Sequence, residues 1–237
     1  MLFSSFSFLL WFLPFTLLLY FLPLPLGARL PWQNAVLLTA SLLFYAWGEP
    51  LYLFLMLGVI AADTLLGLWL ARTAHRRAVL WAAVLLHISL LFYYKYAAFF
   101  AYVCGFSVQQ PHLPLGISFY TFQALSYVID VYRGRVEAEK NPALLGLYIA
   151  LFPQLIAGPI VCYRDVAAAL RQRRHSISGA AAGVRRFAAG LAKKLLLANP
   201  AGALFVTFAA SGAHSAIAAL LALAGYTFQI YFDFSGY

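Results

Sequence analysis

The sequence contains few charged residues and few cysteines. Charged residues make up 10% of its 237 positions, hydrophobic residues make up 64%, and the mean hydropathy is +0.84. A water-soluble core of this size cannot bury so much apolar surface, so water-soluble fold classes are excluded. The two cysteines, Cys104 and Cys162, have no neighbours of metal-ligand type, so we expect neither a disulfide framework nor a metal site.

Acidic residues are also scarce, with 7 Asp and Glu against 16 Lys and Arg and a net charge of +9. Such a balance can indicate nucleic-acid binding, but eleven of the basic residues lie between Arg133 and Lys194, beside apolar runs. Cytoplasmic loops of membrane proteins have this distribution, and no nucleic-acid-binding motif accompanies it. The sequence therefore predicts a lipid bilayer as a partner and no nucleic acid.

The apolar runs extend for about 20 residues without the alternation of a barrel strand, which predicts an all-α, polytopic helical membrane protein. Four runs occupy the first part of the chain, at residues 6–26, 30–47, 51–71 and 78–94. The basic loop at Arg72, Arg76 and Arg77 is cytoplasmic by the positive-inside rule. Asp63 is either an interior hydrogen-bonding residue or part of a site, and we favour the first because nothing titratable accompanies it. We expect His87 to be a satisfied interior histidine.

The chain is organised around residues 113–134, LPLGISFYTFQALSYVIDVYRG. At 100° per residue this apolar stretch places four polar side chains on one stripe of a helix: Gln123, Ser126, Tyr127 and Asp130. Ionisable groups inside a membrane face protein or a wet cavity, so we expect the helix to face inward. We also expect Asp130 to reach Arg133. The alternative is that this pair only anchors a helix end near the headgroups.

Residues 142–161 present a conflict between length and charge. The run is long enough to cross outward, but six arginines follow it within residues 164–186, too much positive charge for an external loop. Pro153, Gly158 and Pro159 also break a regular helix. We therefore predict a re-entrant segment that enters and leaves on the cytoplasmic side, with a cavity around residues 154–159. The alternative is a proline-kinked crossing.

The C-terminal part contains two further apolar or amphipathic segments. Residues 183–197 interleave basic and apolar side chains, which predicts an amphipathic helix on the cytoplasmic leaflet or the beginning of an inserted span. The last run, 217–237, carries Tyr226, Gln229 and Asp233 at i, i+3 and i+7, a second polar stripe. The sequence ends inside this pattern, so we expect residues 1–237 to be a single membrane-embedded domain that is truncated at its C-terminus.

Several ordered segments resemble signatures of one family. They are LPLGISFYTFQALSYVIDVYRG, LFPQLIAGPIVCYRD and YTFQIYFDFSGY, together with the N-terminal MLFSSFSFLL, AVLLTASLLFYAW and FYYKYAAFF. In this order they resemble the bacterial membrane-bound O-acyltransferases (MBOAT family), above all the alginate O-acetyltransferase branch. The resemblance implies the N-terminal portion of a ring of membrane helices around a tunnel, with the re-entrant segment and amphipathic helices forming part of the ring.

The resemblance also implies a catalytic histidine in a Trp-His-x-Ser-Leu context and a second histidine, neither of which occurs in residues 1–237. No catalytic role therefore passes to a histidine of this chain: His75, His87, His112, His175 or His214. We expect the chain of residues 1–237 to be catalytically inactive by itself and to supply walls of the tunnel. The tunnel-lining candidates are Gln123, Asp130, Gln154, Gly158, Pro159, Tyr231, Asp233 and Tyr237. Inward polar residues of helix bundles also serve only to bond neighbouring helices, and that alternative stays open.

The implied activity moves an acetyl group from a cytoplasmic donor to an exported, alginate-like polysaccharide at the periplasmic side of the bacterial inner (cytoplasmic) membrane. The donor, acetyl-CoA or another acetylated carrier, would be a substrate, no cofactor would be bound, and periplasmic acetylation proteins would be partners. Alternatives are D-alanyl transfer to teichoic acid within the same family, a transporter or channel with Asp63, Asp130 and Asp233 on an ion path, and a catalytically empty fragment.

Overall fold

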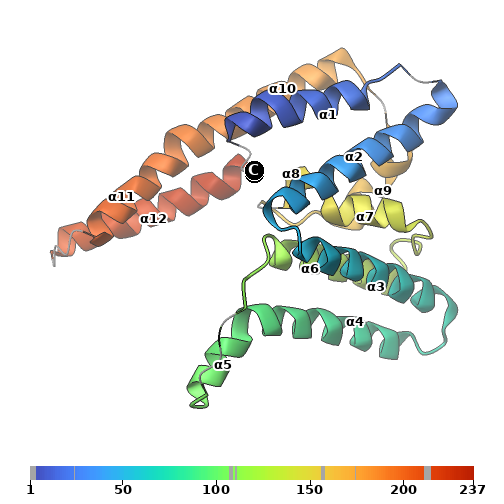
Figure 1. The fold of residues 1–237 in the computed structure, drawn as a ribbon, viewed down its shortest axis with the longest axis horizontal. Coiled ribbons are helices and arrows are strands. Elements are labelled where there is room, and N and C mark those ends of the chain that lie inside the picture. The colour runs from blue at the N-terminus through green and yellow to red at the C-terminus, as the bar shows by residue number, and fades with distance from the viewer. Residues whose placement is uncertain are drawn as a thin grey trace. The chain divides into compact units, whose positions relative to one another are not determined.

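All regular elements in the described ranges are helices, as the sequence predicts. The computed structural model describes residues 4–23, 25–106, 109, 111–155, 158–173, 175–210 and 215–237. In chain order the elements are η1 (Phe8–Phe12), α1 (Leu13–Tyr20), α2 (Leu26–Gly48), α3 (Tyr52–Arg72), α4 (Arg76–Leu91), η2 (Phe92–Tyr96), α5 (Ala97–Val103), α6 (Ile117–Tyr132), α7 (Pro142–Ala150), α8 (Phe152–Leu155), α9 (Tyr163–Arg171), α10 (Ile177–Ala192), η3 (Lys193–Ala198), α11 (Asn199–Ala210) and α12 (Ala216–Gly236), where η denotes a π-helical segment (Figure 1).

Four continuous helices within these ranges are long and apolar enough to cross a membrane. They are Tyr52–Arg72, Arg76–Val103, Ile177–Ala209 and Ala216–Gly236. The chain is therefore a multi-pass membrane protein. The first expected span is shorter than predicted, because its helix covers only Phe8–Tyr20 and ends before Pro23 and Pro25, whose rings cannot continue a helix.

The described chain divides into two compact units. One contains α1 to α9, and the other contains α10, η3, α11 and α12 together with residues 4–11 and 158–159. In the first unit, α6 contributes much of the buried core, including Tyr120, Ala124, Tyr127 and Val128. Gly67 on α3 lets α6 approach closely, because a Cβ there would lie 2.6 Å from the Tyr127 hydroxyl.

Contacts between helix ends agree with the predicted topology of the first unit. Arg76, in the loop expected to be cytoplasmic, donates two 2.9 Å hydrogen bonds to the carbonyls of Val131 and Tyr132 at the C-terminal end of α6. At the other helix ends, His112 Nε2 lies 3.0 Å from a carboxylate oxygen of Glu49. The basic loop before α4 therefore meets the end of α6 that leads into the basic stretch from Arg133, and the connection between α2 and α3 meets the segment before α6.

In the second unit, α12 runs antiparallel to α11 and packs along it and along η3 (Figure 1). The amphipathic segment expected at 183–197 is continuous with α11, so it begins a longer apolar helix and does not end as a separate surface helix. The span Ile177–Ala209 has 33 residues, or about 50 Å, which exceeds the ~30 Å hydrocarbon core. Its basic N-terminal part can therefore project beyond the membrane while its apolar part crosses.

Candidate functional site

The polar stripe of α6 faces protein, as predicted for an inward-facing helix. The exposed fractions of Gln123, Tyr127 and Asp130 are 1%, 0% and 4%. Gln123 Oε1 is buried and has no hydrogen-bond partner among the described residues. The helix covers 16 residues, fewer than the stretch 113–134, because Pro114 precedes it and Gly116 forms its N-cap with a φ of +70°.

The prediction that Asp130 pairs with Arg133 is wrong, because Asp130 pairs with Arg135. Asp130 Oδ1 lies 3.5 Å from Arg135 Nη1, whereas Arg133 is exposed. The reason is the turn after α6, where Gly134 has a φ of +69° and the Arg135 N–H donates to the Asp130 carbonyl at 2.9 Å. This 6→1 bond is the Schellman arrangement, which folds the chain back over the last helical turn.

Residues 142–161 do not form one crossing helix. The helix α7 has nine residues, about 13 Å, and α8 has only four. Leu155, at the end of α8, places its carbonyl against Gly116 at the beginning of α6, where any Cβ would lie 2.6 Å away. The predicted interruption is confirmed, and both helices are too short to cross a bilayer.

The two flanks of this run meet at Glu139. Its carboxylate accepts hydrogen bonds from the Tyr163 hydroxyl at 2.7 Å, from Arg171 Nη2 at 2.8 Å and from the Asn141 N–H at 3.0 Å. We call these four residues the Glu139 clasp. The chain therefore leaves and returns at the same end of α6, where Tyr127 accepts from the Glu139 N–H at 2.9 Å. This arrangement is the one a re-entrant segment requires.

The electrostatics of the clasp favour an ionised carboxylate. Burial alone would raise the pKa of Glu139, but the Asn141 N–H, the Tyr163 hydroxyl and the Arg171 guanidinium outweigh burial and hold that pKa below its ordinary value. Burial and the neighbouring Glu139 carboxylate raise the pKa of Tyr163, which keeps its hydroxyl a donor. Our sequence reasoning missed Glu139, although its place two residues before Asn141-Pro142, where Asn141 caps a helix, was a usable signal.

Tyr148, also missed from sequence, joins two of the tunnel-lining candidates. Its hydroxyl bonds to the carbonyl of Val161 at 2.7 Å and lies 3.3 Å from the carbonyl of Gln123. Its own carbonyl accepts from Gln154 Nε2 at 3.1 Å. Gln123 on α6 and Gln154 on α8 are therefore held by the same tyrosine, which also fixes the returning chain at Val161.

Asp63 has a titratable neighbour, which corrects the expectation drawn from the sequence. Asp63 Oδ2 on α3 lies 3.2 Å from His87 Nε2 on α4, and the two side chains are 0% and 1% exposed. The other ring nitrogen of His87 bonds to the Ala83 carbonyl at 2.8 Å, so His87 is the satisfied interior histidine that was predicted. The pairing crosses from one helix to another over 24 residues of sequence, which periodicity within a single helix does not reveal.

In the second unit, the stripe of α12 packs against neighbouring helices. Lys194 Nζ lies 2.7 and 2.8 Å from the two carboxylate oxygens of Asp233. The side chain of Gln229 covers Gly202 on α11, where a Cβ would lie 2.7 Å from it. Of the remaining candidates of this unit, Gly158 is buried against Tyr237, and a Cβ added to the glycine would lie 3.3 Å from the Tyr237 Cβ. Pro159 and Tyr231 are exposed.

The chain is similar along its whole length to proteins named as O-acetylases and O-acetyltransferases. It is 40% identical to the probable alginate O-acetylase AlgI of Pseudomonas aeruginosa and 39% identical to that of Azotobacter vinelandii, over 100% of this chain and 47% and 49% of those proteins. It is 32% identical to the peptidoglycan O-acetyltransferase of Helicobacter pylori, over 100% of this chain and 52% of that protein.

The chain thus spans about half the length of the curated relatives it matches, and the matched half is their N-terminal portion. No protein-family model and no solved structure matches it. The similarity covers every described element, including the α6 stripe, the interrupted run 142–161 and α12. The chain belongs to the membrane-bound O-acyltransferase family, in which it is related to the alginate O-acetylases.

Proposed function

We propose that this chain forms the membrane-embedded part of an O-acetyltransferase that moves acetyl groups from a cytoplasmic donor to an exported polysaccharide. The observation that carries the proposal is the similarity of 38–40% identity to proteins named alginate O-acetylase, over the whole chain. The Glu139 clasp supports it, because the clasp is the arrangement that a re-entrant segment requires. Such a segment places irregular backbone at membrane depth, where the backbone must contact protein or line a water-filled cavity.

The chemistry explains why such a cavity is needed. An acetyl thioester on one side must meet a hydroxyl group that stays on the other, and a base that accepts the hydroxyl proton works best where water is restricted. Acetyl-CoA or another acetylated carrier is then a substrate and not a bound cofactor. We infer that the eight tunnel-lining candidates contribute walls, that the protein resides in the bacterial inner membrane and that periplasmic acetylation proteins complete the transfer to the polymer.

The acceptor is proposed to be alginate or a similar uronic polymer. A relative named for peptidoglycan O-acetylation makes peptidoglycan the second candidate, but its identity of 32% is below the 39–40% of the alginate relatives. An ion path is less favoured, because Asp63, Asp130 and Asp233 contact His87, Arg135 and Lys194 respectively. These pairings fit carboxylates that bond neighbouring elements of a helix bundle.

The test is acetylation by the full-length protein in cells. It is expressed in an alginate-producing bacterium that lacks its own alginate O-acetylase, and acetyl esters on the exported polymer are measured. We expect them to return, and labelled acetyl-CoA to be used by inside-out but not by right-side-out membrane vesicles. Absence of polymer esters with the protein present in the membrane would overturn the proposal. Esters on peptidoglycan alone would reassign the acceptor.

A further inference from the structure

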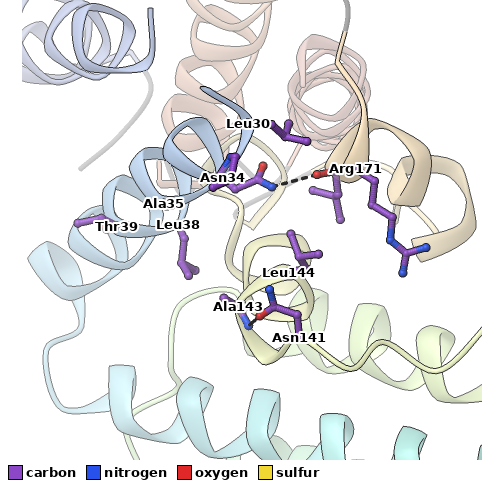
Figure 2. Close-up of a pocket in the computed structure, with 11 residues that line it drawn as sticks. Leu30, Asn34, Ala35, Leu38, Thr39, Asn141, Ala143, Leu144 and Arg171 are labelled. Atoms are coloured by element: carbon purple, nitrogen blue, oxygen red, sulfur yellow. Dashed lines mark hydrogen bonds between the residues drawn. The ribbon is translucent and has the colours of Figure 1, made fainter. Parts of the chain in front are cut away.

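A groove opens in the first unit between α2, α7 and α9. Its volume is about 460 Å³. Figure 2 shows α2 contributing one wall and the first turn of α7 the opposite wall, with the end of α9 beside them. The lining residues are Leu30, Pro31, Asn34, Ala35, Leu38, Thr39, Asn141, Ala143, Leu144, Leu170 and Arg171.

The walls of this groove are mainly aliphatic. Leu30, Leu38, Leu144 and Leu170 line it, and the small residues Ala35 and Ala143 keep it open. From Leu30 to Thr39 the groove follows ten residues of α2, a rise of about 13 Å. A narrow aliphatic groove of this length on a membrane protein fits an alkyl chain, because the chain loses contact with water or loose lipid and gains close packing.

One end of the groove is polar and basic. Asn34 Nδ2 donates to the Leu170 carbonyl at 2.9 Å, which ties α2 to α9 across that end (Figure 2). Arg171 lines the groove with its side chain 53% exposed, and only one of its nitrogens binds Glu139. Arg29 and Lys140 adjoin the lining residues Leu30 and Asn141 in sequence. Glu139 offsets the charge of Arg171, so the excess positive charge at this end comes from Arg173, whose Nη2 donates to Oδ1 of the lining residue Asn34.

The basic end belongs to the side of the membrane that the positive-inside rule assigns to the cytoplasm. An aliphatic groove with a cationic rim at the headgroup level complements a molecule with an alkyl chain and a negatively charged head. The inner leaflet supplies such molecules as anionic phospholipids, and arginine binds their phosphate with paired N–H donors.

We propose that this groove binds an anionic glycerophospholipid of the cytoplasmic leaflet, with an acyl chain between α2 and α7 and the phosphate at Arg171. The lipid would seal the junction of α2, α7 and α9 next to the Glu139 clasp and thereby hold the re-entrant segment in place. Lipid binding at this groove does not depend on the acetyltransferase activity, so it is tested separately from the proposed function.

The experiment is native mass spectrometry of the full-length protein after purification in mild detergent and titration with defined lipids. We expect one phosphatidylglycerol to be retained per chain, about fivefold more tightly than phosphatidylethanolamine, since one basic residue near an anionic headgroup contributes on this scale. Ala35→Trp fills the groove and should abolish retention. Leu43→Trp is the matched control on α2, at a position 62% exposed and outside the groove, and should retain the lipid.

Headgroup recognition is tested separately from the clasp. Arg171→Gln should remove the preference for phosphatidylglycerol, whereas Glu139→Gln, which breaks the same ion pair but leaves the arginine, should keep it. Equal retention by Ala35→Trp and the wild type, or no preference for the anionic lipid, would overturn the proposal. Stabilisation by inorganic phosphate or acetyl-CoA with no retained lipid would also overturn it, because the site would then bind a free anion. Melting curves of each variant confirm that the protein is folded.

Discussion

The hydroxyl of Tyr163 donates a 2.7 Å hydrogen bond to the buried carboxylate of Glu139, so residues 24 positions apart meet at one end of the apolar run between them. A kinked crossing would separate these residues by the thickness of the membrane. The contact therefore favours the re-entrant interpretation, in which α7 and α8 lie along α6 from Tyr127 toward Gly116, a distance of about 16 Å.

The first prediction concerns the charge of the clasp. Glu139→Gln keeps the size of the side chain but removes the negative charge that Arg171 and Tyr163 face. Arg171 is about half exposed, so we expect a loss of only about 1–2 kcal/mol, seen as a lower melting temperature of the detergent-solubilised protein. Glu137→Gln, at an exposed position two residues earlier, is the control and should melt like the wild type. Equal melting of all three proteins would contradict the role of Glu139.

The second prediction follows from the lowered pKa of Glu139. A carboxyl whose pKa is lower in the folded protein than in the unfolded chain stabilises the fold above the unfolded pKa and loses that contribution as the pH falls through the folded pKa. The melting difference between wild type and Glu139→Gln should therefore be constant from pH 8 to about pH 5 and shrink below about pH 4. A difference that grows on acidification would mean that the carboxyl is bound in its protonated form.

The length and periodicity of the apolar runs predicted the all-α fold and the inward stripe of α6, and the proline and glycine residues of the run 142–161 predicted its interruption, which lies at Leu151 between α7 and α8. These patterns did not predict contacts made between helices. Asp63 meets His87 only because α3 and α4 pack together, and Asp130 meets Arg135 only because Gly134 turns the chain back. The sequence alone also left the second polar stripe open to either a tunnel or a helix contact, and within its own unit Asp233 contacts Lys194.

The third prediction concerns Tyr148, which holds the returning chain at Val161 and contacts both Gln123 and Gln154. Tyr148→Phe removes only the hydroxyl, so the ring packing against Tyr163, with centroids 5.2 Å apart, should remain. If the proposed tunnel passes these residues, acetyl transfer by the full-length protein should fall several-fold while its amount in the membrane is unchanged. Tyr93→Phe, at a position 57% exposed, is the control. Unchanged acetylation by Tyr148→Phe would remove this region from the reaction path.

The fourth prediction addresses the Asp63–His87 pair. Asp63→Leu leaves a buried ring nitrogen of His87 without its partner, and His87→Leu leaves the buried carboxyl unpaired. Each single change should destabilise the protein by about 1–3 kcal/mol. The double variant should lose less than the sum of the two, because no unpaired polar group then remains between α3 and α4. Melting temperatures of the four proteins form the cycle, and strictly additive losses would show that the two side chains are not coupled.

The fifth prediction separates two roles of Asp233, which contacts Lys194 and is also a tunnel-lining candidate. Asp233→Lys alone places two cations together and Lys194→Asp alone places two anions together, so both should lower the melting temperature of the full-length protein. The exchange of both residues restores opposite charges at 2.7 Å and should recover most of that loss. If Asp233 only bonds its neighbouring helix, the exchanged protein should also acetylate normally. If the carboxylate itself faces the path of the acetyl group, stability should return without activity, because the exchange restores the ion pair but moves the carboxylate from α12 to η3.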